Sequence, residues 1–146
     1  MKSPNLISKA AIMLCFLLLE GCARKQTIRF ILPNGFRGIV KLQCEHFEGI
    51  SIRATNNTLS LVVPETGVLT IKESLPTTDW HLTEACYANG NSIPVVDSGY
   101  RSANSIAFRT VGSKGTSEEW FVVGTFEELK AAKEKQDGFK WPSSKP

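Results

Sequence analysis

Cys44 and His46 are two residues whose types and spacing could do chemistry. They fall at the end of an alternating run, and residues two apart on a strand share a face. A thiol beside an imidazole base is the pairing that thiol enzymes use. No third group that would orient the imidazole is evident, and no signature of a thiol enzyme surrounds Cys44. The sequence therefore favours an inward-facing cysteine and a histidine at a strand end over a catalytic pair.

A metal site would have to be assembled from His46, Glu48, Asp79 and His81. None of the spacings typical of zinc or calcium sites is present, and no serine lies in a nucleophile elbow. The sequence therefore predicts no metal and no cofactor, and it names no catalytic residue.

Three aromatic side chains, Trp80, Tyr87 and Tyr100, fall in or near irregular segments. Tyrosine and tryptophan are favoured at recognition surfaces. These residues are therefore candidates for a ligand-binding surface, although a tryptophan folded under its own loop is the commoner arrangement.

The stretch Leu19-Glu20-Gly21-Cys22 suggests a second chemistry, in which lipid is attached to the thiol of Cys22. Lys2 and Lys9 precede a ten-residue apolar run, 10–19, which is the layout of a secretory signal. The run is too short to span a bilayer, which takes about 20 apolar residues. The stretch resembles the lipobox of bacterial lipoproteins, except that Glu20 stands where that family has a small or apolar residue.

This resemblance implies that residues 1–21 are a cleaved signal peptide and that Cys22 receives lipid. The membrane is then a partner through that lipid (palmitate among its acyl chains), and the protein is expected in the cell envelope. If the cell has two membranes, Ala23 after the cysteine implies the outer membrane, facing the periplasm or the exterior.

Length and charge place limits on the remaining chain. The protein has 146 residues, enough for one domain with a real core. Loss of Lys2, Lys9 and Glu20 with the signal lowers the formal charge from +3 to +2. That balance is too mild to argue for a nucleic-acid partner.

Cys44 and Cys86 are the two thiols that remain when Cys15 leaves with the signal and Cys22 takes the lipid. Exported compartments are oxidising, so a Cys44–Cys86 disulfide is predicted. The alternative is two separate buried thiols, since free cysteine behaves as a small hydrophobe.

Short runs that alternate apolar and polar residues, with turn residues between them, indicate β-strands. Such runs cover 28–32, 40–44, 50–54, 59–63 and 69–71. A further strand is expected at 84–88 and a hairpin from 105–111 and 118–125, with loops at 73–83 and 95–104. The pattern predicts a mainly β fold, an antiparallel β-sandwich-like domain with one C-terminal helix.

The segment 120–123, Trp-Phe-Val-Val, is apolar on both faces and predicts a strand covered on both sides. The cover is expected in the next segment. Thr125 and Glu128 fit a capping box, and Gly138 fits a C-terminal cap, so a helix is predicted from Phe126 to Gln136. The predicted organisation is a signal peptide (1–21), a lipidated tether (22–26), a β-rich domain with a C-terminal helix (27–138) and a tail (139–146).

The stretch 30–38, Phe-Ile-Leu-Pro-Asn-Gly-Phe-Arg-Gly, resembles the opening of uncharacterised bacterial exported domains. The stretch 121–125, Phe-Val-Val-Gly-Thr, is similar to their ending. The resemblance implies one intact domain. It implies no activity and no site residues, because that group carries no established function.

The first functional hypothesis is a non-enzymatic binding or structural module at the envelope, whose partner is an unknown envelope protein or ligand. The alternatives are an inhibitor or immunity-type lipoprotein and, less favoured, a hydrolase or thiol enzyme that uses Cys44 and His46.

Overall fold

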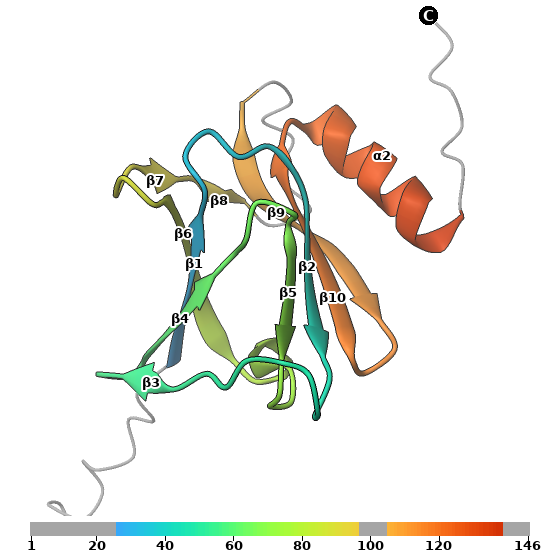
Figure 1. Cartoon of the computed structure of the whole chain (residues 1–146). Helices are drawn as coiled ribbons and strands as arrows, with labels where there is room; N and C mark the ends of the chain where they lie inside the picture. Colours follow the sequence, from blue (N-terminus) through green and yellow to red (C-terminus); the bar gives the residue numbers. More distant parts are fainter. Residues whose placement is uncertain (1–25, 97–104, 139–146) are drawn as a thin grey trace, which may run out of the picture.

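The strands of the computed structural model divide between two five-stranded sheets, and a helix lies outside them (Figure 1). The structure describes residues 26–96 and 105–138. Sheet A has the order β3-β4-β1-β6-β7 and sheet B the order β5-β2-β10-β9-β8. The elements of sheet A are β1 (Gln26–Leu32), β3 (Ala54–Thr55), β4 (Thr58–Val62), β6 (His81–Tyr87) and β7 (Ser92–Ile93). Those of sheet B are β2 (Gly38–Cys44), β5 (Val68–Ile71), β8 (Val95–Val96), β9 (Ala107–Lys114) and β10 (Glu118–Gly124).

The core lies between the two sheets. Alternate residues of β1, namely Ile28, Phe30 and Leu32, are completely buried there. The Phe30 ring packs against the rings of Phe108 and Phe121, with centroids 4.7 Å and 4.9 Å away. The mainly β, sandwich-like fold predicted from the alternating runs is confirmed.

The pairing within the sheets is mixed, whereas the sequence predicted antiparallel sheets. β1 pairs in parallel with β4 and β6, and β2 pairs in parallel with β5. The antiparallel pairs include the predicted hairpin, β9 with β10. The reason is the route of the chain: β1, β2, β4, β5 and β6 alternate between the sheets, so strands that become neighbours in one sheet run the same way.

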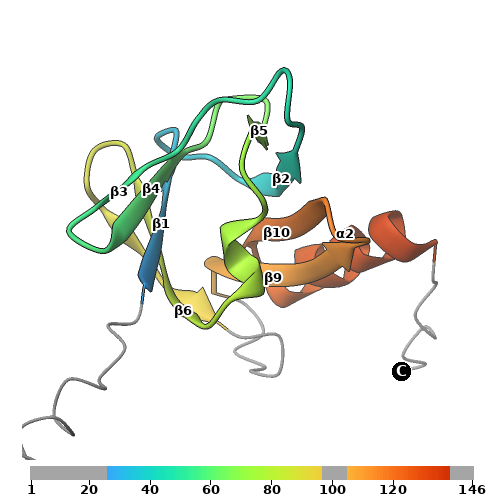
Figure 2. The same cartoon turned by 90° about the horizontal axis from the view of Figure 1, so that it is seen from below.

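Helix α2 (Phe126–Asp137) packs on the outer face of sheet B (Figures 1 and 2). Its capping box is formed as predicted, and Gly138 caps its end in the left-handed conformation, with φ 67°. Leu129 and Ala132 of the helix pack against Trp120 and Val122 of β10. The prediction that this strand is covered on both faces is confirmed.

Three segments differ from the predicted elements, and one is β8 (Val95–Val96), which pairs with β9 at the start of the predicted loop 95–104. The run 50–54 is mostly irregular: Ile50 makes an isolated bridge to Ile71, and the short β3 begins only at Ala54. β6 begins at His81, inside the predicted loop, because it pairs with β1 from Gln26 onward. Within the described residues no helix is both long enough and apolar enough to cross a membrane.

Candidate functional site

Cys44 and His46 do not form a thiol–imidazole pair in the structure. β2 ends at Cys44, so His46 lies in the following turn and not on the strand. The Nδ1 atom of His46 lies 2.9 Å from the carbonyl oxygen of Lys72, and the Cys44 Sγ lies 3.9 Å from the same oxygen. A ring nitrogen facing a carbonyl is the protonated one. The two side chains therefore share an acceptor and do not contact each other as nucleophile and base.

The predicted Cys44–Cys86 disulfide is not formed, and both residues are free thiols. Cys44 packs against the core on sheet B, as its alternation with Val40 and Leu42 predicted. Cys86 belongs to sheet A, where its neighbour Ala85 points into the core, so the thiol points outward. The prediction was wrong because the sequence did not assign the face of its strand that Cys86 occupies.

The candidate binding aromatics are not brought together. Trp80 precedes β6 and Tyr87 is its last residue, and the seven residues of this strand span about 20 Å in extended form. Trp80 is 77% exposed, whereas Tyr87 packs against the core and its hydroxyl donates to the carbonyl of Phe36 at 3.5 Å. Tyr100 and the lipidation candidate Cys22 lie outside the described residues.

The residues considered for a metal site are also dispersed. His46 follows β2 of sheet B, whereas His81 begins β6 of sheet A. In the part of the chain that the structure describes, no three His, Cys, Asp or Glu side chains are grouped to hold a metal ion.

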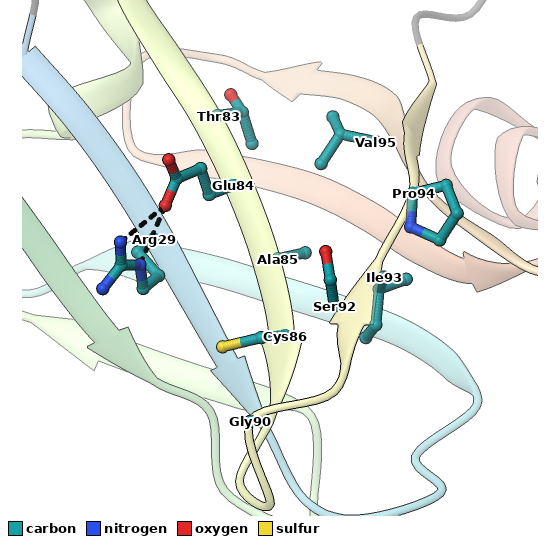
Figure 3. A pocket seen from close by; sticks show the side chains of 10 residues that line it. All are labelled: Arg29, Thr83, Glu84, Ala85, Cys86, Gly90, Ser92, Ile93, Pro94 and Val95. Carbon is teal, nitrogen blue, oxygen red and sulfur yellow. Dashed lines mark hydrogen bonds and ion pairs between the residues drawn. The ribbon is translucent and has the colours of Figure 1, made fainter.

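A cavity of about 660 Å³ lies along β6 beside β7 and β8, and we call it the β6 cavity (Figure 3). Its charged groups satisfy each other, because the Arg29 Nε and Nη2 atoms lie 2.9 and 2.8 Å from one carboxylate oxygen of Glu84. Cys86 lies on the same side of β6 as Glu84. Among the described residues that line this cavity, no side-chain N or O atom is both buried and without a hydrogen-bond partner.

A second cavity, of about 410 Å³, opens between the two sheets beneath the short 3-10 helix η1 (Pro76–Thr78), and we call it the end cavity. Pro76 stands at the first position of η1, where its fixed φ suits a helical turn. The cavity is lined by hydroxyl, acidic and aromatic side chains and one imidazole: Thr77, Thr78, Asp79, Trp80, His81, Thr83, Thr110, Glu119 and Phe121.

The Thr77 hydroxyl is the strongest indication that the end cavity binds a ligand. Its Oγ1 atom is buried and has no hydrogen-bond partner among the described residues. The neighbouring Thr78 hydroxyl, by contrast, donates to the Leu75 carbonyl at 3.0 Å. Leaving a buried hydroxyl unpaired costs about 1–3 kcal/mol, so native structures seldom keep one without a reason.

The other groups of the cavity suit recognition of a polar molecule. His81 Nδ1 lies 2.6 Å from the carbonyl oxygen of Asp79, so the remaining ring nitrogen is the one that can accept a hydrogen bond. Glu119 and Thr110 add an acceptor and a hydroxyl, and Phe121 supplies an apolar surface. These groups can hold a ligand that carries hydroxyl or amide groups as well as an apolar face.

Sequence reasoning singled out Trp80 and His81 but missed Thr77, Thr83, Thr110 and Glu119. Thr83, Thr110 and Glu119 lie in strands, where threonine and glutamate are ordinary residues of a polar face, and Thr77 lies in a segment that was predicted to be a loop. Only the spacing of the two sheets makes them neighbours around one cavity.

No family model matches the chain, and no curated protein matches it. Among solved structures, it is similar to a crystal structure described as "Putative Lipoprotein from Bacillus anthracis", with a TM-score of 0.40 and 8% sequence identity. The similarity covers 83% of this chain and 85% of the other. A similarity of this size assigns the chain neither to a family nor to a function.

Proposed function

We propose that this protein is a lipid-anchored, non-enzymatic binding module of the cell envelope, and that the end cavity holds its ligand. The observation that carries the binding role is the buried, unpartnered Thr77 hydroxyl in a cavity that opens beside the exposed Trp80. The signal-like start and Gly21-Cys22 support the anchor. The shared contact of Cys44 and His46 with one carbonyl supports a role without thiol catalysis.

The binding role is tested with Thr77→Val, which keeps the shape of the side chain and removes its hydroxyl. If the hydroxyl is kept for a ligand, the variant gains about 1 kcal/mol in free energy of unfolding, because a buried unpaired group disappears. Native mass spectrometry of protein purified from the envelope should then show a bound molecule on the wild type and less of it on the variant.

Thr78→Val is the matched control. Its hydroxyl already bonds the Leu75 carbonyl, so its removal should cost about 1 kcal/mol of stability. Equal retention of the bound molecule by wild type and Thr77→Val, or destabilisation by both substitutions, would contradict the proposed site.

The anchor is tested with Cys22→Ala. This variant should no longer incorporate labelled fatty acid and should accumulate with its signal attached. Normal processing and labelling of the variant would remove the anchor from the proposal.

A further inference from the structure

The two ends of the sandwich differ in their exposed apolar side chains. At the end where β1 begins lie Phe47, 95% exposed, and Trp80, 77% exposed, together with Leu82 and Ile50, each more than half exposed. At the opposite end the exposed apolar side chains are aliphatic: Val62, which pairs with Ile31 late in β1, is 61% exposed, and Val68, Val95 and Ile106 are between 37% and 41% exposed. We call the first end, defined by Phe47, Ile50, Trp80 and Leu82, the apolar end.

Strand register fixes which residues share the end where β1 begins. His81 and Leu82 of β6 pair with Gln26 and Thr27, the first two residues of β1. The chain turns from β1 into β2 at the other end, so the segment after β2, which carries Phe47, returns to the start of β1. Figure 1 shows the start of β1, the segment after β2 and η1 at the lower end of the molecule, and Figure 2 views that end directly.

The position of the proposed anchor indicates that the apolar end faces the membrane. Cys22 precedes Gln26 by four positions, and four extended residues span at most about 14 Å. A lipid on Cys22 therefore holds the start of β1 within about 14 Å of the bilayer surface. The apolar end is the part of the domain that this tether brings to the membrane.

We propose that the apolar end docks on the lipid bilayer, with Phe47, Trp80 and Leu82 entering the interfacial layer. This inference rests on the proposed anchor at Cys22. Tryptophan suits the position because its ring is apolar while its N–H meets the polar headgroups. The tether, the turn that carries Phe47 and the segment at Trp80 come from separate parts of the chain, so together they hold one orientation.

Charge at this end indicates the kind of bilayer. Glu45, Glu48, Glu73 and Asp79 are acidic there, and Arg53 and Lys72 are basic, so the surface carries a weak net negative charge and does not attract anionic lipids. Docking is therefore driven by apolar side chains and suits zwitterionic lipids. The end cavity, which Trp80 lines, then opens close to the headgroups.

The test uses the full lipidated protein in phosphatidylcholine vesicles whose acyl chains carry bromine, a quencher of tryptophan fluorescence. The difference in quenching between wild type and Trp80→Phe reports Trp80 alone. We expect strong quenching of Trp80. Replacing Phe47 and Leu82 together by serine should weaken docking, by about tenfold for each apolar side chain removed, and should reduce that quenching.

The matched control replaces Val95 and Ile106, exposed at the opposite end, by serine, and it should leave the quenching of Trp80 unchanged. Unquenched Trp80 in lipidated protein overturns the docking but leaves the anchor in place. A control pair that lowers quenching as much as the Phe47 and Leu82 pair also overturns the docking. Protein whose mass shows no lipid on Cys22 removes the anchor and this inference together.

Discussion

The outer faces of the two sheets are built differently, although both sheets share one core. On sheet B, Val111, Trp120 and Val122 are buried under helix α2. On sheet A, the corresponding outward positions hold the half-exposed ion pair of Arg29 with Glu84, and within the described residues no helix covers them.

The difference follows from the strands at the centre of each sheet. β1 alternates over most of its length, so one layer of packing buries Ile28, Phe30 and Leu32, and the outward Ile31 is only partly buried. β10 is apolar on both faces, and its outward side chains need a second apolar layer, which the helix provides. The number of apolar faces on a central strand therefore sets the number of layers around it.

Removal of the helix contact should have the largest effect. Leu129→Ala leaves a cavity between α2 and sheet B and should cost about 2–5 kcal/mol of stability, measured by urea unfolding. The control on the open face is Val62→Ala, where the side chain is 61% exposed and the change should stay within about 0.5 kcal/mol. Similar losses for the two variants would end the distinction between a covered and an open face.

The same comparison can be made with two arginines. Arg109 on β9 is completely buried, and its Nε donates to the Gly124 carbonyl at 3.2 Å. Arg109→Met leaves that carbonyl without this donor and should cost about 1–3 kcal/mol. Arg29→Met on the open face breaks a solvent-exposed ion pair and should cost less than about 1 kcal/mol. Thermal unfolding of both variants measures the difference, and a larger loss for Arg29→Met would reverse the comparison.

The cap of the covering helix gives a smaller, pH-dependent effect. The Thr125 side chain accepts a hydrogen bond from the backbone N–H of Glu128, so Thr125→Ala should cost about 1 kcal/mol. The backbone N–H of Thr125 and the Arg37 guanidinium lower the pKa of Glu128 below its ordinary value.

A lowered pKa sets the direction of the pH dependence. The stabilisation by Glu128 is fully present above the carboxyl pKa of the unfolded chain, and it is lost as the pH falls through the lower pKa of the folded chain. Glu128→Gln should therefore lose stability at neutral pH and show a shallower decline in acid. A decline as steep as that of the wild type would show that Glu128 does not contribute.

Alkylation of the two free cysteines should have the smallest effect on stability. Cys44 faces the core from sheet B, and Cys86 lies on the outward face of sheet A, so both should be alkylated in protein purified without reductant. Mass spectrometry of a digest that has not been reduced counts the modified thiols. A pair of peptides linked by a disulfide would show that Cys44 and Cys86 lie close enough to bond.

Much of the local structure could be predicted from the sequence, because it depends on residues close together in the chain. Alternation located β1, β2, β4 and β5, the predicted hairpin located β9 and β10, and Thr125 with Glu128 marked the start of α2. The apolar run of β10 also predicted a second packing layer on sheet B, which α2 provides. These features follow from side-chain period and from hydrogen bonds between near neighbours, which the sequence states directly.

The tertiary structure alone decided the sheet in which each strand lies, and with it the parallel pairing, the separation of Cys44 from Cys86 and the end cavity. An alternating strand has the same pattern in either sheet and in either direction, so its own residues do not specify a partner. The chain route also leaves the Thr77 Oγ1 atom buried without a hydrogen-bond partner among the described residues, at a cavity lined by both sheets. The residues near Thr77 in the sequence do not indicate this, because Thr110, Glu119 and Phe121, which complete the cavity, come from the distant strands β9 and β10.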